Sequence, residues 1–69
     1  MLTWTTKYLG AHRVEVGMKG EDHLFTIYED AQGYPTVQGY GKYAAYRTRH
    51  TSVEGAKTAA LTRMNWGKN

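Results

Sequence analysis

Apolar and polar residues alternate along the first part of the chain, a period typical of β-strands with one covered and one exposed face. Residues 2–8 alternate until Gly10 interrupts the run, residues 13–18 alternate again, and an apolar stretch follows at residues 23–28. One side of the first segment carries Leu2, Trp4, Thr6 and Tyr8. The pattern therefore predicts three consecutive strands in the first half of the chain.

A glycine at the start of a two-residue turn sets the expected register of the second and third strands. Gly20 and Glu21 suit a hairpin turn that has glycine in its first position. The pairs that follow from this turn are Met18 with His23, Val16 with Phe25, and Val14 with Ile27. Both apolar rows then lie on one face, and the opposite face carries Glu15 beside Thr26 and Arg13 beside Tyr28.

A second turn is predicted at residues 30–34. Gly33, at the end of a three-residue loop, can adopt the left-handed conformation that such loops require. The register that follows places Ile27 opposite Val37 and Phe25 opposite Gly39.

The β-patterned run after this turn is too long to form one flat strand beside a short neighbour. It extends over residues 36–49. Gly39 and Gly41 are expected to mark a bulge or bend within it. Residues 43–49 either continue this strand or form another one that pairs with the N-terminal segment.

A helix is predicted from about Ser52 to Asn65. Thr51 and Glu54 fit a capping box, in which each side chain satisfies a free amide of the first turn, and Gly67 is the expected stop. The apolar stripe of the helix consists of Val53, Ala56, Ala60 and Met64, with Leu61 at its edge. Since the apolar face of a lone sheet must be covered, we expect the helix to lie across it.

These elements predict an α+β fold with three or four antiparallel strands packed by one C-terminal helix, a βββα-like order. The 69 residues form one domain, residues 1–69. The chain starts at Met1 and its first residues lack the order of a signal peptide, so we expect a complete chain without a leader. The longest apolar run is far below the roughly 18 residues of a membrane span.

The absence of cysteine excludes a disulfide framework and a thiolate metal site, and it favours a cytoplasmic location. Charge is unevenly distributed along the chain. Residues 1–30 hold three Lys or Arg and five Asp or Glu, whereas residues 31–69 hold six and one. This asymmetry predicts a basic surface that attracts an anionic partner; ordinary solubility charge is the alternative explanation.

A glycine-rich motif and three histidines could indicate a binding or catalytic site, but neither has the sequence context that such a site requires. Residues 39–44, Gly-Tyr-Gly-Lys-Tyr-Ala, match a dinucleotide-binding fingerprint, but they lie within β-patterned sequence instead of opening a helix. His12, His23 and His50 match no metal-ligand spacing and have no partner nucleophile. A chain this short also encloses a substrate pocket with difficulty. We therefore expect no enzymatic activity, no cofactor, no metal and no small-molecule substrate.

The strongest functional signal is an alternation of tyrosines and cations between residues 40 and 50. Cations contact phosphates and aromatic rings stack on bases, so this mixture is typical of nucleic-acid binding. Tyr43 and Tyr8 are expected in the core, since tyrosine is also a core and strand residue. The predicted nucleic-acid-binding residues are Arg13, Tyr28, Tyr40, Lys42, Tyr46, Arg47, Arg49, Lys57 and Arg63.

The order strand–strand–strand–helix, with Thr-Ser-Val-Glu-Gly-Ala-Lys at residues 51–57, resembles small DNA-binding domains of the AP2 type and of integrase N-termini. Those domains lay a three-stranded sheet in the major groove, so the resemblance implies DNA contact through the sheet. Residues 56–61, Ala-Lys-Thr-Ala-Ala-Leu, also look like the last helix of double-stranded-RNA-binding domains. In overall style the chain resembles short accessory proteins of phages and mobile elements.

The sequence thus favours a small non-enzymatic binding module, and two hypotheses stand beside each other. The first is nucleic-acid binding through the basic, tyrosine-rich sheet surface. The alternative is a phage-type inhibitor or adaptor that binds a host protein complex through an outer-face patch of Leu24, Tyr28 and Tyr40, or through an edge strand. Self-association into a homo-oligomer and a structural role in a larger assembly are further alternatives.

Overall fold

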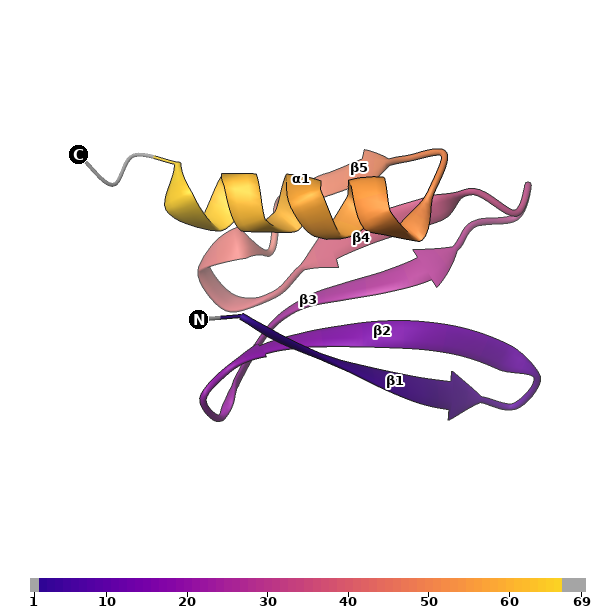
Figure 1. Cartoon of the computed structure of the whole chain (residues 1–69), viewed down its shortest axis with the longest axis horizontal. Helices are drawn as coiled ribbons and strands as arrows, with labels where there is room; N and C mark the ends of the chain where they lie inside the picture. Colours follow the sequence, from indigo (N-terminus) through magenta and orange to yellow (C-terminus); the bar gives the residue numbers. More distant parts are fainter. Residues whose placement is uncertain (1, 67–69) are drawn as a thin grey trace.

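The computed structural model describes residues 2–66, which form a five-stranded antiparallel sheet with one helix lying across it (Figure 1). The strands follow one another in the sheet in chain order. The elements are β1 (Thr3–Leu9), β2 (His12–Lys19), β3 (Asp22–Glu29), β4 (Pro35–Gly39), the short 3₁₀ helix η1 (Gly41–Tyr43), β5 (Arg47–Arg49) and α1 (Val53–Asn65). The predicted α+β class is confirmed, whereas the strand count of three or four was wrong.

The fifth strand arises because the long β-patterned run reverses direction in its middle. β4 ends at Gly39, and Gly41, with φ of +61°, opens η1. The chain then returns so that Arg47–Arg49 pairs with β4. A Cβ at Gly39 would lie 2.7 Å from the Cβ of Tyr43, so only glycine fits at this reversal. The expected bend is confirmed, but the pairing of residues 43–49 with the N-terminal segment was wrong.

A β-bulge corrects the predicted register of the β2–β3 hairpin. Met18 pairs with His23 as expected, but Gly17 then pairs with Phe25, so Leu24 is one extra residue on β3. Beyond the bulge Val16 pairs with Thr26 rather than with Phe25. A one-residue shift sends a whole row of side chains to the other face of a sheet.

The bulge therefore assigns side chains to two distinct faces, which we call the covered face, across which α1 lies, and the open face on the opposite side. Phe25 and Ile27 belong to the covered face, and Val14 and Val16 to the open face. Arg13 has the parity of Glu15 and so lies on the covered face. Its predicted place beside Tyr28 was wrong.

The core forms where α1 packs on the covered face of β3 and β4. Phe25 and Val37 are fully buried, and the Phe25 ring stacks on Tyr43 at 5.0 Å between centroids. The core residues are Phe25, Ile27, Val37, Tyr43, Ala56, Ala60 and Met64. Alanines on the helix allow it to approach the sheet closely. The predicted pairs of Ile27 with Val37 and Phe25 with Gly39 are confirmed.

The helix confirms its predicted length and corrects its predicted cap. It begins at Val53, and the Oγ of Ser52 accepts a hydrogen bond from the Gly55 amide at 3.0 Å. Ser52, not Thr51, is thus the N-cap. The expected stop at Gly67 lies outside the described residues. Figure 1 shows α1 over one half of the sheet, with β1 and β2 farther away.

Three tyrosines separate according to their place in the sheet. Tyr43 is buried in the core as expected. Tyr8 is 69% exposed, so its predicted core position was wrong. Tyr46, one of the predicted nucleic-acid-binding residues, packs edge-on against Phe25, with 6.1 Å between the ring centroids.

Candidate nucleic-acid interface

The open face carries two rows of side chains that cross the sheet. The register of the four strand pairs aligns Thr5, Val16, Thr26, Gln38 and Arg47 in one row. Another row joins Tyr28, Thr36 and Arg49. Lys7 pairs with Val14, on the same face as the Thr5 row. The open face thus combines hydroxyl and amide groups with the buried side chains of Val14 and Val16, and its cations lie toward both edges.

Arg47 and Arg49 are the cations of the β5 edge. They stand two residues apart in one strand, so both side chains project from the same face about 7 Å apart. The Nε of Arg47 donates a hydrogen bond to the Oε1 of Gln38 at 3.1 Å. The Nε of Arg49 lies 2.8 Å from the Oδ2 of Asp30, and its guanidinium lies 5.2 Å from the centre of the Tyr34 ring.

A shallow hollow opens between these arginines and the end of β3. Its volume is about 250 Å³, and it is lined by Tyr28, Asp30, Thr36, Arg47 and Arg49. Two guanidinium groups, a phenol ring and a hydroxyl converge there. This combination can hold an anionic oxygen against the arginines while an aromatic ring packs beside it.

Asp30 is the acid of this hollow, and it is already engaged. Its Oδ1 accepts hydrogen bonds from the amides of Gln32 and Tyr34, both at 2.9 Å. The hydrogen bond from the Tyr34 amide, that from Gln32 and the Arg49 charge together hold the pKa of Asp30 below its ordinary value. Asp30 therefore stays charged at neutral pH and competes with any anion for Arg49.

A second exposed aromatic side chain, Tyr40, lies on the open face near the turn between β2 and β3. Tyr40 packs against His23 with 4.4 Å between ring centroids, and it remains 40% exposed. The Nε2 of His23 lies 2.7 Å from the Oγ1 of Thr26, which belongs to the open face. Tyr28 and Tyr40 thus stand toward opposite ends of the β3–β4 part of this face.

The covered face holds one buried carboxylate, Glu15, which is paired with two cations. Glu15 is only 5% exposed, and its carboxylate accepts a hydrogen bond from Thr6 at 2.7 Å. It also lies 3.2 Å from Arg13 and 3.5 Å from Lys57. Burial raises the pKa of Glu15, but the Thr6 hydrogen bond and the two cations outweigh it, so the pKa lies below its ordinary value. Arg13 and Lys57 are therefore committed to Glu15.

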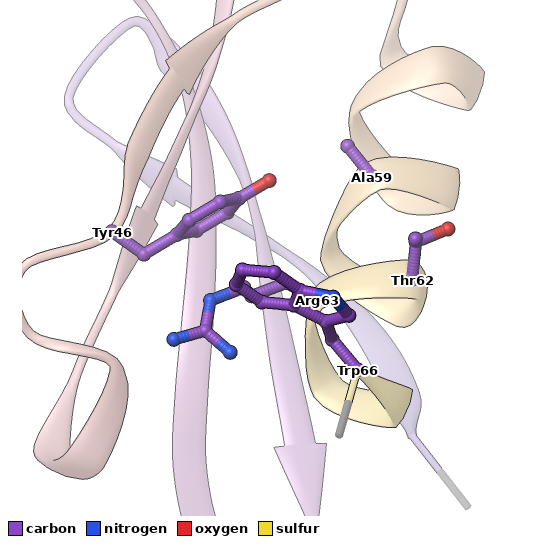
Figure 2. Close-up of a pocket in the computed structure, with 5 residues that line it drawn as sticks. All are labelled: Tyr46, Ala59, Thr62, Arg63 and Trp66. Carbon is purple, nitrogen blue, oxygen red and sulfur yellow. The ribbon is translucent and has the colours of Figure 1, made fainter. Parts of the chain in front are cut away.

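Arg63 lies among aromatic rings at the end of α1 (Figure 2). Its guanidinium is 5.0 Å from the ring of Trp66, 5.4 Å from Tyr43 and 5.9 Å from Tyr46. The surrounding hollow, about 300 Å³, is lined by Tyr46, Ala59, Thr62, Arg63 and Trp66. These cation–π contacts hold the Arg63 guanidinium among the rings at the end of α1. This helix lies on the side of the molecule opposite the open face.

The structure therefore divides the residues that the sequence singled out. Tyr28, Tyr40, Arg47 and Arg49 share the open face. Arg13 lies on the covered face, Lys57 and Arg63 belong to α1, which lies across that face, and Tyr46 packs against the core. Lys42, in η1, lies 5.3 Å from the Tyr43 ring.

Sequence reasoning did not single out Lys7 and Thr36 as members of this surface. Lys7 could have been found from the alternation of β1, since it shares a side with Thr5. Thr36 carried no signal, because its place depends on the strand that pairs beside it.

Within residues 2–66, no group of three or more His, Cys, Asp or Glu side chains gathers in a way that could hold a metal ion. The helix of this described part is not long and apolar enough to cross a membrane. Residues 39–44 lead from β4 into the three-residue 3₁₀ helix η1, whereas a dinucleotide site requires an α-helix that begins at the glycine motif.

Comparison with known proteins gave no match: no protein-family model, no curated protein and no solved structure is similar to this chain. The function of this protein is therefore inferred from its own residues.

Proposed function

We propose that this protein binds nucleic acid through the open face of its sheet, with Arg47 and Arg49 contacting phosphates and Tyr28 and Tyr40 stacking on bases. Lys7 adds attraction at the far edge. Thr26 and Gln38 lie between the cations and supply hydrogen-bonding groups. No catalytic step is part of this proposal.

The observation that carries the proposal is the separation of charge between the two faces. The acidic residues within the described strands are Glu15, Asp22 and Glu29, and all three have the parity of the covered face. The strand cations divide between the faces: Lys7, Arg47 and Arg49 lie on the open face, where no strand acid stands beside them, whereas Arg13 and Lys19 lie among the acids of the covered face. The open face therefore attracts an anionic polymer, and the carboxylate of Asp30 is the nearby negative charge that repels it.

The aromatic rings favour a single strand over a duplex. Bases of single strands are free to stack on side chains, and open sheets that carry aromatic residues bind them in this way. Tyr40 is exposed beside His23, and Tyr28 lies next to the arginine hollow. We expect single-stranded DNA or RNA to bind more tightly than a duplex of the same sequence.

Fluorescence anisotropy with labelled single strands of about 20 nucleotides tests this proposal, since such strands exceed the usual site size of a small sheet domain. We expect saturable binding that weakens steeply with salt. The double variant R47A/R49A should lose about tenfold or more in affinity at low salt. Its slope of log affinity against log salt should fall by about 1.4, since each lost single-strand phosphate contact contributes roughly 0.7.

The matched control is R13A/K19A, which removes the same charge from the covered face. It should retain most of the affinity and the salt slope of the original protein. Equal losses in the two double variants would mean that net charge alone drives binding. No binding at low salt would refute the proposal outright, since electrostatic attraction is strongest there.

A second candidate function is protein binding, as an inhibitor or adaptor that acts on a host protein complex. The observation that favours it is Trp66, which is 75% exposed at the rim of the aromatic hollow beside α1 (Figure 2). Exposed tryptophan is typical of binding hot spots. Trp66→Ala should abolish such a complex in a pull-down and leave oligonucleotide affinity unchanged.

A further inference from the structure

The two edges of the sheet differ in how well they are protected from pairing with another strand. β5 is three residues long and carries two arginines. β1 is seven residues long, Thr-Trp-Thr-Thr-Lys-Tyr-Leu, with one charge and no proline or glycine. Its register with β2 is unbroken by any bulge. Short length, charge, proline and bulges are the usual protections of an edge, and β1 has only Lys7.

The turn that follows β1 determines which of its backbone groups are free. Gly10 has a φ of +63° and Ala11 a negative φ, so Leu9 and His12 close a two-residue turn of type II′. The closing residues of such a turn are a hydrogen-bonded pair, and bonded pairs alternate along antiparallel strands. The backbone groups of Trp4, Thr6 and Tyr8 therefore point away from β2, toward the open edge.

We propose that two copies of this chain associate by antiparallel pairing of their β1 strands, with the two-fold axis at Thr6. In this register Thr6 faces Thr6 of the second copy, and Trp4 faces its Tyr8. All three outward-pointing residues are then used, which gives about six backbone hydrogen bonds between the copies. Lys7 faces Thr5, so no like charges stand opposite each other.

The side chains on the covered side support this register over its neighbours. Tyr8 is 69% exposed in the single chain, and pairing with Trp4 of the other copy supplies the aromatic contact that it lacks. An axis at Lys7 would place two lysines directly opposite each other, and an axis at Thr5 would leave Tyr8 beyond the paired strand. A two-fold axis perpendicular to the sheet keeps both open faces on one side.

Cysteine crosslinking tests the axis directly, because the chain contains no cysteine of its own. Residues of a hydrogen-bonded antiparallel pair have Cα atoms about 5.5 Å apart, within the range that a disulfide spans. Thr6→Cys should give a covalent dimer under mild oxidation. Thr3→Cys, which faces Leu9 of the second copy, should give only the background level.

Sedimentation velocity across a concentration series supplies the second readout. The unmodified protein should show a monomer–dimer equilibrium. Tyr8→Pro removes an outward amide from a largely exposed position and should shift the protein to monomer. Tyr8→Phe keeps the amide and the ring and should remain dimeric. Circular dichroism confirms that both variants fold.

The proposal is overturned by a monomer at every concentration together with equal crosslinking of the two cysteine variants. It is equally overturned by a dimer that Tyr8→Pro does not weaken, because another surface would then hold it. Neither result bears on the oligonucleotide affinity of the open face, so this inference and the proposed function fail separately.

Discussion

The two faces of this sheet are made by the same five strands, yet they differ in almost every physical respect. The covered face combines fully buried apolar side chains with one buried carboxylate, and α1 closes over its β3–β4 half. The open face presents threonine, glutamine and arginine from the same strands. Covered-face residues stabilise the domain, whereas the exposed side chains of Lys7, Arg47 and Arg49 place cations on the open face, where a partner can reach them. This contrast separates stability from binding, and each variant below should affect one and spare the other.

The largest effect is expected in β3, where neighbouring residues point to opposite faces. Phe25→Ala should destabilise the protein by about 3–5 kcal/mol, because it leaves a cavity beneath α1. Thr26→Ala, on the open face, should cost less than about 1 kcal/mol. A domain of this size has only about 3–5 kcal/mol of net stability, so Phe25→Ala should be largely unfolded in thermal or urea melts. Similar melts for the two variants would contradict the assignment of faces.

The second effect concerns Glu15, the buried acid of the covered face. Its pKa in the folded protein is lower than its value of about 4.5 in the unfolded chain. The charged carboxylate therefore stabilises the fold above pH 4.5, and this contribution is lost as the pH falls through the lowered pKa. Glu15→Gln should cost about 1.5–3 kcal/mol at pH 7, the usual range for a hydrogen bond to a charged group.

Urea titrations between pH 7 and pH 3 measure this dependence. The stability of Glu15→Gln should fall less steeply than that of the original protein below pH 4.5. Glu29→Gln, which removes an exposed acid from the same face, is the matched control and should follow the original curve. Parallel curves for all three proteins would contradict a stabilising role of the Glu15 carboxylate.

The smallest effect is a gain of affinity. Asp30→Asn removes the charge that opposes an anion at Arg49, while its Oδ1 can still accept the amides of Gln32 and Tyr34. The Asp30–Arg49 ion pair is open to solvent and therefore weak, so oligonucleotide affinity at low salt should rise only about two- to fivefold. Glu54→Gln, at the start of α1, makes the same charge change elsewhere and should leave affinity nearly unchanged. A fall in affinity with Asp30→Asn would mean that the hollow does not bind an anion.

Much of the fold could be predicted from local patterns. The turn at Gly20 and Glu21, the second hairpin and the span of α1 all follow from glycine positions and from apolar periodicity. The bulge at Leu24 could not be predicted, because Val14 and Val16 form as good an apolar row as Phe25 and Ile27. What decides between them is long-range: Gly17 leaves room for the Trp4 ring, and Glu15 meets Lys57 from the helix.

The candidate site was predictable only in part for the same reason. Tyr28, Arg47 and Arg49 were singled out by residue type, but their common face depends on β5 returning beside β4. Arg13 and Tyr46 are of the same residue types but lie elsewhere. The bulge places Arg13 on the covered face, and Tyr46 packs against Phe25. Residue type thus identified the candidate binding residues, and the strand register determines which of them share the open face.

The most direct test of the central claim is methyl NMR of the protein titrated with a single-stranded oligonucleotide. Thr26 and Thr36 report on the open face, and Thr6 and Thr48 report on the covered face of the same sheet. We predict that the open-face methyl signals shift in proportion to occupancy while the covered-face signals stay in place. Larger shifts at Thr6 and Thr48 than at Thr26 and Thr36 would contradict the account.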